Sequence, residues 1–585
     1  MSHDRNICLP RRHGLRGLPL AVLACGGLAF APAHAAAGVA PADLILSHAR
    51  VYTVEEARPW AEAVAIRNGR ILAVGSAKEV AAYRGGATRV VDLGGRFLMP
   101  AFGDAHAHPV FGGLSYARCS LHDGKTVDDY RRIIARCIAR TPGTGTIYGS
   151  GWEDGLFPPH GVPSKQILDQ ISADRPLIFA STGGHSLWVN SKALALAGIT
   201  RDTPDPPNGK IDRDAAGEPV GGLEEDPGMK LVEKLVPPPT DADRQDAIAY
   251  TAKLFNSLGI TSWHDAMLEW EKGGTSLVLD AYKVVRDRGG LTAHTVLDIK
   301  WDNSRGLEQM PEVMRLSTDA RAKGFAANGV KFFIDGVIPQ ETAAMLAPYE
   351  GSTARGSPEI PPARLAEAVS MLDAKGMQSH FHAIGDGAVR EALDAVASAR
   401  RRDGRSDTRP MISHLNVIDP ADQPRFGALG VTAIFQPLWA CNEPYMDLAI
   451  RKIGPVRARS IYPEASVLKG GGLIAYGADW SVASANPLEG IEVAITRVAP
   501  GGTRPPLLPG EAVSLETALQ AYTLNVAYVN HLETLTGSIV PGKSADLIVL
   551  DRDLFKIRPT DIHQAKVLVT IYEGREVFGS LGQLR

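Results

Sequence analysis

The middle of the chain alternates between helical and strand-like patterns, and this alternation limits the possible folds more than any other feature. An apolar stripe at helical spacing precedes a strand-like run over 377–382, and a second helical stripe follows it. The stripes consist of Leu365, Val369 and Leu372, ended by Gly376, and of Val389, Leu393 and Val396. Further short apolar runs cover 411–414, 431–435 and 473–479. Strand–helix alternation over this length indicates a parallel β/α architecture.

The two ends of the chain have a different, β-rich pattern. Near the N-terminus, two short apolar runs flank Asn68-Gly69, which is the strongest local signal for a β-hairpin. Near the C-terminus, similar runs flank the turn Glu573-Gly574. Two β-rich ends around a long alternating middle suggest that the ends pair with each other.

These patterns predict an α/β fold with three parts. Residues 42–97 and 535–585 are expected to combine into one small composite β-sandwich, and residues 98–534 to form an inserted parallel β/α barrel. A chain of 585 residues is long enough to bury a barrel-sized core beside a smaller domain. The stretch over about 109–258 is less regular and rich in proline and glycine. We expect it to be an insertion after the first barrel strand that covers the active site.

The first residues predict an export signal. Three arginines between positions 11 and 16 precede an apolar run over 18–30, which leads to Ala33-His34-Ala35. This order of charged, apolar and small residues is that of a secretory signal peptide. A core helix or a membrane anchor is the alternative, but glycines interrupt the run and it is too short to span a bilayer. We therefore expect residues 1–35 to be removed, the mature chain to have no stable membrane span, and the protein to be periplasmic or secreted.

Removal of the leader leaves three cysteines, Cys119, Cys137 and Cys441. Their spacing does not match a metal-binding C-x-x-C motif. A disulfide between Cys119 and Cys137 is possible in an oxidising compartment. Free structural thiols are equally compatible with the sequence.

The overall charge is nearly balanced, with 62 Lys and Arg against 65 Asp and Glu and a formal net charge of -3. Such a balance provides no basic field for nucleic acid and no acidic tail. We therefore expect the partner to be a small molecule, and the sequence does not indicate an oligomeric state.

The strongest local motif is a His-x-His pair, His106 and His108, at the end of an apolar strand that begins at Leu98. Residues two apart on a strand point to the same face, so both imidazoles can reach one cation. Catalytic groups of a barrel lie at the carboxyl ends of its strands, where this pair is placed. An isolated His-x-His is otherwise more often a coincidence than a metal site.

Three more polar residues interrupt apolar strands in the same way: Lys331, His382 and His414. Burying a charged lysine among apolar neighbours is costly without a partner, and carboxylation by CO₂ would make Lys331 an anionic bidentate ligand. The alternative is a lysine whose ammonium group reaches solvent. His380 competes with His382 because both lie on one face of a strand, and we favour His382 because it is nearer the strand end.

Asp479 ends the apolar run over 473–478, again at a strand end. A carboxylate there could bind metal and accept the proton of an attacking water, as metal-assisted hydrolysis requires. A helix N-cap or a turn aspartate is an equally plausible local interpretation.

The order of these residues resembles that of the amidohydrolase superfamily, and specifically the amidohydrolase family 3 branch that includes N-substituted formamide deformylases. The resemblance covers essentially all of the chain after the leader. Besides the residues above, it includes the segments Gly184-His185-Ser186, Val189 to Leu194, Gly259-Ile260-Thr261, His264-Asp265-Ala266, Lys331 to Gly336, Thr342-Ala343-Ala344, His382 to Asp386, Gly537-Ser538-Ile539 and Pro541 to Leu547. Many matched segments in the same order make a chance resemblance very improbable.

The resemblance implies a composite β-sandwich with a distorted TIM barrel and a centre of one or two metal ions, usually zinc. The implied ligands are His106, His108, carboxylated Lys331, His382, His414 and Asp479. Departures from the branch are Ala478 and Ser481 beside Asp479, and Gly387 where arginine is common. They leave the ligands intact but put the substrate contacts in doubt.

The sequence therefore predicts a metal-dependent hydrolase of a C–N bond, of amide, N-acyl amine or N-formyl amine type, with Asp479 as general base. Trp152 and His185 in the insertion are candidate substrate contacts, although packing within the insertion explains them equally well. Carbamates, cyclic amides and esters are alternative substrates, because the same metal site serves all of them. A non-catalytic periplasmic binding protein on the same fold is the remaining alternative.

Overall fold

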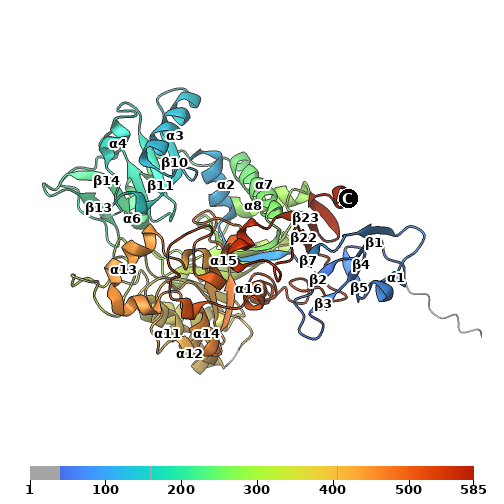
Figure 1. Ribbon diagram of the computed structural model, residues 1–585. Helices are drawn as coiled ribbons and strands as arrows, with labels where there is room; N and C mark the ends of the chain where they lie inside the picture. Colours follow the sequence, from blue (N-terminus) through green and yellow to red (C-terminus); the bar gives the residue numbers. More distant parts are fainter. Residues whose placement is uncertain (1–39, 159–160, 405, 585) are drawn as a thin grey trace, which may run out of the picture. The chain divides into compact units, whose positions relative to one another are not determined.

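A computed structural model describes residues 40–158, 161–404 and 406–584 (Figure 1). The predicted signal peptide lies outside these residues. Within the described part of the chain, every helix is too short or too polar to cross a membrane.

Eight parallel strands form the central sheet, in the order β21-β20-β19-β18-β17-β16-β15-β8. These strands are β8 (Phe102–Ala107), β15 (Ile260–Leu268), β16 (His294–Lys300), β17 (Ala326–Phe333), β18 (Gln378–Ala383), β19 (Met411–His414), β20 (Thr432–Phe435) and β21 (Leu473–Tyr476). The sheet closes where Ala107 pairs in parallel with Trp480 and where the amide of Asp479 donates to the carbonyl of His106. The predicted (β/α)8 barrel is therefore confirmed.

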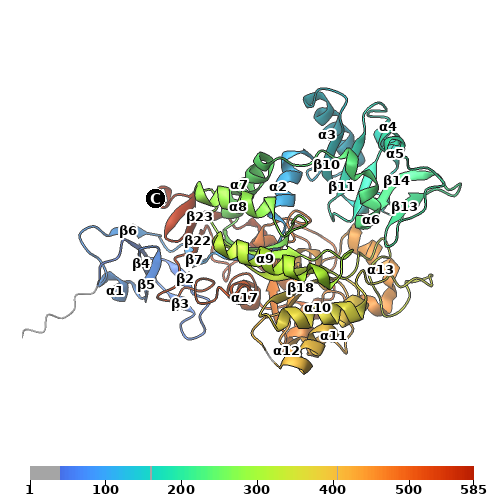
Figure 2. The ribbon, with the colours of Figure 1, turned by 180° about the vertical axis from the view of Figure 1, so that it is seen from behind.

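Helices cover the outside of the barrel sheet. They include α7 (Asp241–Ser257), α8 (Leu277–Asp287), α9 (Met310–Ala322), α10 (Pro362–Asp373), α11 (Asp386–Asp403) and α12 (Gln423–Leu429). Helix α10 packs against α11, and α11 packs against α12 (Figure 2). The α10 face that carries Leu365, Val369 and Leu372 is buried in the main core, as the helical spacing predicts.

The two chain ends share one six-stranded sheet, in the order β24-β23-β22-β7-β2-β3. In this sheet β7 (Phe97–Pro100) lies between β2 (Arg50–Tyr52) and β22 (Leu547–Leu550). The remaining strands are β3 (Trp60–Ala61), β23 (Val567–Tyr572) and β24 (Arg575–Gly579). A four-stranded sheet, β5-β4-β1-β6, consists of β5 (Arg70–Gly75), β4 (Ala63–Arg67), β1 (Leu44–Ser47) and β6 (Arg89–Asp92). One apolar core joins residues of both sheets, so the predicted composite β-structure is confirmed.

The apolar run before the His-x-His pair forms two strands rather than one. Its first part is β7, which belongs to the small sheet, and its second part is β8, which belongs to the barrel. The break falls at Ala101, directly after Pro100, which has no amide hydrogen to continue a ladder. The chain thus passes from one sheet into the other just before the metal-binding motif.

The insertion is more regular than its composition suggests. It forms a six-stranded sheet, β13-β14-β12-β11-β10-β9, with two apolar cores of its own. The strands are β9 (Cys119–Ser120), β10 (Ile147–Trp152), β11 (Leu177–Ser181), β12 (Ser186–Val189), β13 (Lys210–Arg213) and β14 (Pro219–Glu224). Helix α7, within the predicted insertion range, instead packs against α8 and β15 of the barrel. The prolines and glycines therefore belong to a folded subdomain, some of them within its strands β10 and β14.

A disulfide joins Cys119 on β9 to Cys137 in α3 (Val127–Arg140). Of the two possibilities that the sequence left open, the structure has the disulfide. Cys441 is a buried free thiol.

Candidate active site

The carboxyl ends of the barrel strands bring the predicted metal-binding residues together. His106 lies on β8, Lys331 on β17, His382 on β18 and His414 on β19, and each side chain is buried. His108 and Asp479 follow β8 and β21. Because parallel strands of a barrel end at one mouth, these residues converge although they are far apart in sequence.

Asp479 lies at the centre of this group. Its Oδ1 is 3.1 Å from Nε2 of His108 and 3.3 Å from Nε2 of His106. Its Oδ2 is 3.8 Å from Nδ1 of His414. His106, His414 and Asp479 each direct a possible ligand atom within 4.8 Å of the others. The spacing is that of side chains that could share one ion.

The backbone is strained at two of these positions. Asp479 has a φ of 55° and His414 a φ of 81°, a left-handed conformation that side-chain-bearing residues rarely adopt. Such outliers persist where the surrounding structure enforces them, and they concentrate at functional sites.

Lys331 lies deep in the group, with Nζ 3.2 Å from Nε2 of His106 and 4.9 Å from the ring centre of Phe333. Its side chain has no solvent exposure, so the alternative of a lysine that reaches solvent does not apply. Burial lowers the pKa of Lys331 to about 8, although Asp479 and Asp298 oppose the shift. A buried amine with so low a pKa is partly neutral near physiological pH.

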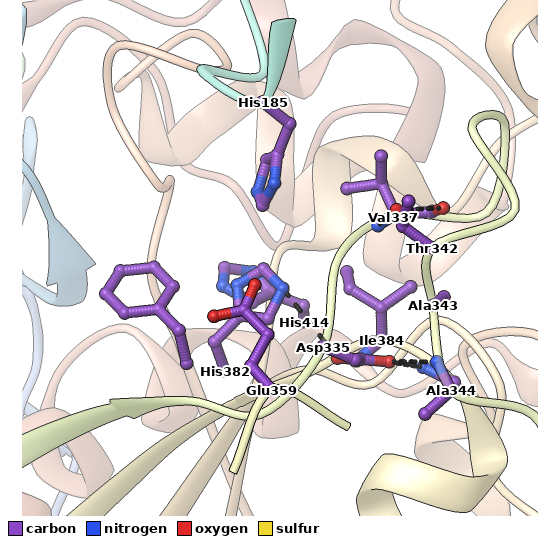
Figure 3. Close-up of polar contacts among 12 residues, drawn as sticks. His185, Asp335, Val337, Thr342, Ala343, Ala344, Glu359, His382, Ile384 and His414 are labelled. Atoms are coloured by element: carbon purple, nitrogen blue, oxygen red, sulfur yellow. Dashed lines mark hydrogen bonds and ion pairs between the residues drawn. The ribbon is translucent and has the colours of Figure 1, made fainter. Parts of the chain in front are cut away.

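The two histidines of β18 lie at different depths. The ring of His382 is 4.4 Å from that of His414, and both residues line a cavity (Figure 3). His380 lies deeper, with Nε2 3.0 Å from Nδ1 of His106 and Nδ1 2.5 Å from Oδ2 of Asp298. His382, not His380, therefore faces the cavity.

The donor set fits a divalent metal ion. Nε2 of His382 is one of the buried polar atoms that have no hydrogen-bond partner among the described residues. Burial lowers the pKa values of His106, His382 and His414 well below the usual range, which keeps these imidazoles neutral as ligands must be. The imidazoles of His108 and His414 outweigh the effect of burial on Asp479 and lower its pKa, so the carboxylate is ionised. Neutral imidazoles with a carboxylate are characteristic ligands of a divalent cation.

A cavity of about 1860 Å³ opens above these residues. It is lined by side chains of the barrel and of the insertion, among them His108, His185, His382, His414, Trp439 and Asp479. The insertion therefore contributes directly to the space in which a substrate would bind.

His185, one of the two predicted substrate contacts, points from the insertion toward His382 and His414 (Figure 3). Its ring centre is 5.3 Å from that of His382, and its Nδ1 is 2.8 Å from Oε2 of Glu225. The other carboxylate oxygen of Glu225 accepts a hydrogen bond of 2.5 Å from the hydroxyl of Thr342. Burial lowers the pKa of His185, but the carboxylate of Glu225 more than offsets this and raises it to about 9.

A glycine makes room for this contact between insertion and barrel. A Cβ atom on Gly336 would come within 2.2 Å of both the Glu225 carboxylate and the Thr342 hydroxyl. Any other residue at this position would displace the two groups that hold His185.

Trp152, the other predicted contact, does not line the cavity. Its side chain is buried in the insertion core, where its indole N–H donates to the carbonyl of Phe179. Its ring packs against Phe157 and Trp188 at centre distances of 5.8 Å and 6.4 Å. Of the two interpretations of Trp152, packing within the insertion agrees with its position.

Sequence reasoning did not identify Asp298, which forms a second buried group with His264 and His380; polar atoms of these three residues lie within 4.8 Å of one another. Asp298 interrupts the apolar run of β16 as Lys331 interrupts that of β17, so the same signal could have identified it. Glu225 gave no such signal because it lies in an acidic, glycine-rich segment of the insertion.

Comparison with known proteins identifies the family of the chain. The model of the amidohydrolase family matches residues 89–578. The chain is 30% identical over 554 residues to protein LONG AFTER FAR-RED 3 of Arabidopsis thaliana, covering 92% of each. It is 27% identical to the putative amidohydrolase YtcJ of Bacillus subtilis, covering 90% of this chain and 98% of the relative. The N-substituted formamide deformylase of Arthrobacter pascens is 25% identical, with 91% and 97% covered.

Solved structures share the fold. An uncharacterised metal-dependent hydrolase of Pyrococcus furiosus superposes with a TM-score of 0.65 at 24% identity, covering 88% of this chain and all of its own. A similar protein of Pyrococcus horikoshii has a TM-score of 0.67 at 23% identity, covering 88% of this chain and 99% of its own. With the metal-binding group at the barrel mouth and a family match over most of its length, the chain belongs to the amidohydrolase family, in the family 3 branch.

Proposed function

We propose that this amidohydrolase hydrolyses a non-peptide C–N bond, of the amide, N-acyl amine or N-formyl amine type. The observation that carries the proposal is the position of Asp479, an ionised carboxylate beside His106 and His108 on the floor of a large cavity. The relative named as an N-substituted formamide deformylase, similar over nearly the whole chain, supports this substrate class.

The residues that would hold the metal are His106, His108, Lys331, His382, His414 and Asp479. We propose zinc as the ion, because imidazole and carboxylate donors suit it, and Lys331 as a carboxylated ligand. Bound metal would supply Lewis acidity and make a water acidic enough to attack near neutral pH.

Asp479 would act as the base and then as the acid. Its carboxylate accepts one proton of the attacking water while the water oxygen bonds to the substrate carbonyl carbon. When the C–N bond breaks, the same proton passes to the leaving nitrogen, which departs as an amine. The proton and the electron pair of the broken bond thus both end on the amine.

His185 would bind the substrate from the opposite side of the cavity. Its Nδ1 is held by Glu225, so the ring edge that carries Nε2 is oriented by the insertion rather than free to turn. A hydrogen bond from this edge would place the substrate carbonyl over the metal-binding residues.

A panel of substrates tests this function. The metal-loaded protein would be incubated with N-formyl amines, N-acyl amines, carbamates, cyclic amides and esters, and release of amine, carboxylic acid or alcohol measured. We expect the amides to be turned over, and the Asp479→Asn variant to turn them over about 10²–10⁴-fold more slowly. Turnover of only esters, carbamates or cyclic amides would show that the proposed substrate class is wrong. If the metal-loaded protein turned over no compound of the panel, the proposed function would be refuted.

We also propose that the protein is exported. The arginine-led apolar leader supports this, as does the disulfide between Cys119 and Cys137, since disulfides persist mainly in oxidising compartments. Mass spectrometry of the native protein tests the proposal: a mature N-terminus near Ala36 is expected, and retention of Met1 or Ser2 would refute it.

A further inference from the structure

A chain of buried polar groups lies beneath the candidate metal site. It consists of Asp298 on β16, His380 on β18, Ser413 on β19 and His106 on β8, and none of the four side chains has solvent exposure. Oδ2 of Asp298 is 2.5 Å from Nδ1 of His380, and Nε2 of His380 is 2.6 Å from Oγ of Ser413. Oγ of Ser413 is 2.9 Å from Nδ1 of His106. Four strands thus supply one continuous set of hydrogen bonds.

The chemistry of the groups determines the direction of these bonds. An ionised carboxylate can only accept, so Nδ1 of His380 donates to Asp298. Nε2 of His380 is then left as an acceptor for the hydroxyl hydrogen of Ser413. The oxygen of Ser413 in turn accepts from Nδ1 of His106. Every hydrogen therefore points toward Asp298.

Asp298 is well suited to terminate such a chain. Its Oδ2 also lies 2.8 Å from Nε2 of His264, which gives the carboxylate a second imidazole neighbour. Burial alone would raise the pKa of Asp298, but His264 and His380 lower it, so the carboxylate stays ionised. Its other oxygen lies where a Cβ on Gly329 would be only 1.7 Å away, so this position on β17 must be glycine.

The direction of these hydrogen bonds determines the tautomer of His106. With its hydrogen on Nδ1, His106 presents the lone pair of Nε2 toward Lys331 and Asp479, at 3.2 Å and 3.3 Å. The opposite tautomer would direct an N–H at the metal site and could not ligate. In metal sites, partners of this kind orient the ligand histidine, and their loss costs about 10–100-fold in metal affinity or activity.

We propose that Asp298, through His380 and Ser413, is a positioning residue that holds His106 in the tautomer able to bind metal. The inference rests on the metal site of the proposed function and adds residues that touch neither the metal nor the substrate.

The test measures metal binding without any substrate. Affinity for Zn²⁺ would be measured by competition with a chromophoric chelator, and ligand geometry from the visible absorption spectrum of the Co²⁺-loaded protein. We expect Asp298→Asn to weaken Zn²⁺ binding by about 10–100-fold and to change the Co²⁺ spectrum. Ser413→Ala should have a smaller effect, because Nδ1 of His106 is still 3.0 Å from Nε2 of His380.

A matched control exists at the other end of β16. There His294, the first residue of the strand, has its Nε2 2.9 Å from Oδ2 of Asp546, a buried carboxylate that precedes β22 and lies outside the network. Asp546→Asn removes the charge of a similar Asp–His pair, so it should leave Zn²⁺ affinity and the Co²⁺ spectrum unchanged even if it lowers the melting temperature. An equal loss of affinity in this control would show a merely structural effect and overturn the proposal.

His380→Gln is the second variant, to be used if Asp298→Asn does not fold. Glutamine still offers an acceptor to Ser413 but cannot donate to Asp298 from the position of Nδ1, so the same loss of affinity is expected. A folded variant of either kind that binds Zn²⁺ within threefold of the parent, with the parent spectrum, would overturn the inference. A parent that binds neither ion would overturn the metal site itself, whereas a parent that binds metal but hydrolyses no substrate would overturn only the proposed function.

Discussion

The Nζ atom of Lys331 lies 3.2 Å from the Nε2 atom of His106, and neither side chain has any solvent exposure. Two nitrogen bases are thus buried together at the mouth of the barrel, beside the carboxylate of Asp479. A charged ammonium here would repel a metal ion held by His106. Addition of CO₂ to the neutral amine would instead form a carbamate, release one proton and add the anionic oxygens that a metal site requires.

Lys331→Ala should therefore reduce the metal content of the purified protein and abolish turnover. Reconstitution of the parent with metal should be faster in bicarbonate than in CO₂-depleted buffer, because the carbamate must form before the site is complete. Metal analysis and a ¹³C NMR signal of a carbamate after incubation with ¹³C-bicarbonate are the measurements. Full metal content in Lys331→Ala, or the absence of a carbamate signal in active protein, would remove this ligand from the account.

Glu225→Gln and His185→Gln should lower kcat/KM by a similar factor, on the order of 10–100. Glu225→Gln weakens the contact that holds the His185 ring over the cavity, and His185→Gln removes the ring. The control is Glu492→Gln, which alters another pair of a buried glutamate and a partly exposed histidine outside the cavity, with 2.7 Å between Oε2 of Glu492 and Nδ1 of His563. Steady-state kinetics of the three variants checks this. Unchanged kinetics in Glu225→Gln would mean that the insertion does not orient the substrate through His185.

Loss of the disulfide should destabilise the insertion rather than the barrel. The bond joins residues 18 apart, for which the loss of loop-closure entropy in the unfolded chain contributes about 3 kcal/mol. The Cys119→Ser/Cys137→Ser variant should melt at a lower temperature and be cleaved by protease within the insertion, and reductant should change the parent but not the variant. Equal melting temperatures of parent and variant would contradict the expected contribution.

Most of the candidate metal ligands at the barrel mouth could be predicted from sequence, because they are polar residues within or directly after apolar strands. Lys331, His382 and His414 share that pattern, and strand ends meet at one place in a parallel barrel. Depth along a strand is harder to predict. His380 and His382 share a face; nearness to the strand end favours His382, and the structure places His382 at the cavity and His380 deeper, against Asp298.

The positions of Trp152 and Glu225 in the insertion could not be predicted from sequence, for a different physical reason. For Trp152 the sequence leaves a substrate contact and packing within the insertion equally open, and the structure places its side chain in a separate core of the insertion. The role of Glu225 follows from its contacts with His185 and with Thr342, which lies 117 residues away in sequence. Contacts between an insertion and a barrel loop leave no periodic pattern in either segment.

The kcat of Asp479→Asn, measured together with its metal content, tests the central claim most directly. The amide keeps the shape of the side chain and an oxygen ligand but cannot accept a proton near neutral pH. With metal still bound, kcat should fall by about 10²–10⁴ while KM changes little, because the proton transfer contributes to the transition state and not to substrate binding. A metal-loaded variant with a kcat close to that of the parent would contradict the role of Asp479 and, with it, the proposed mechanism.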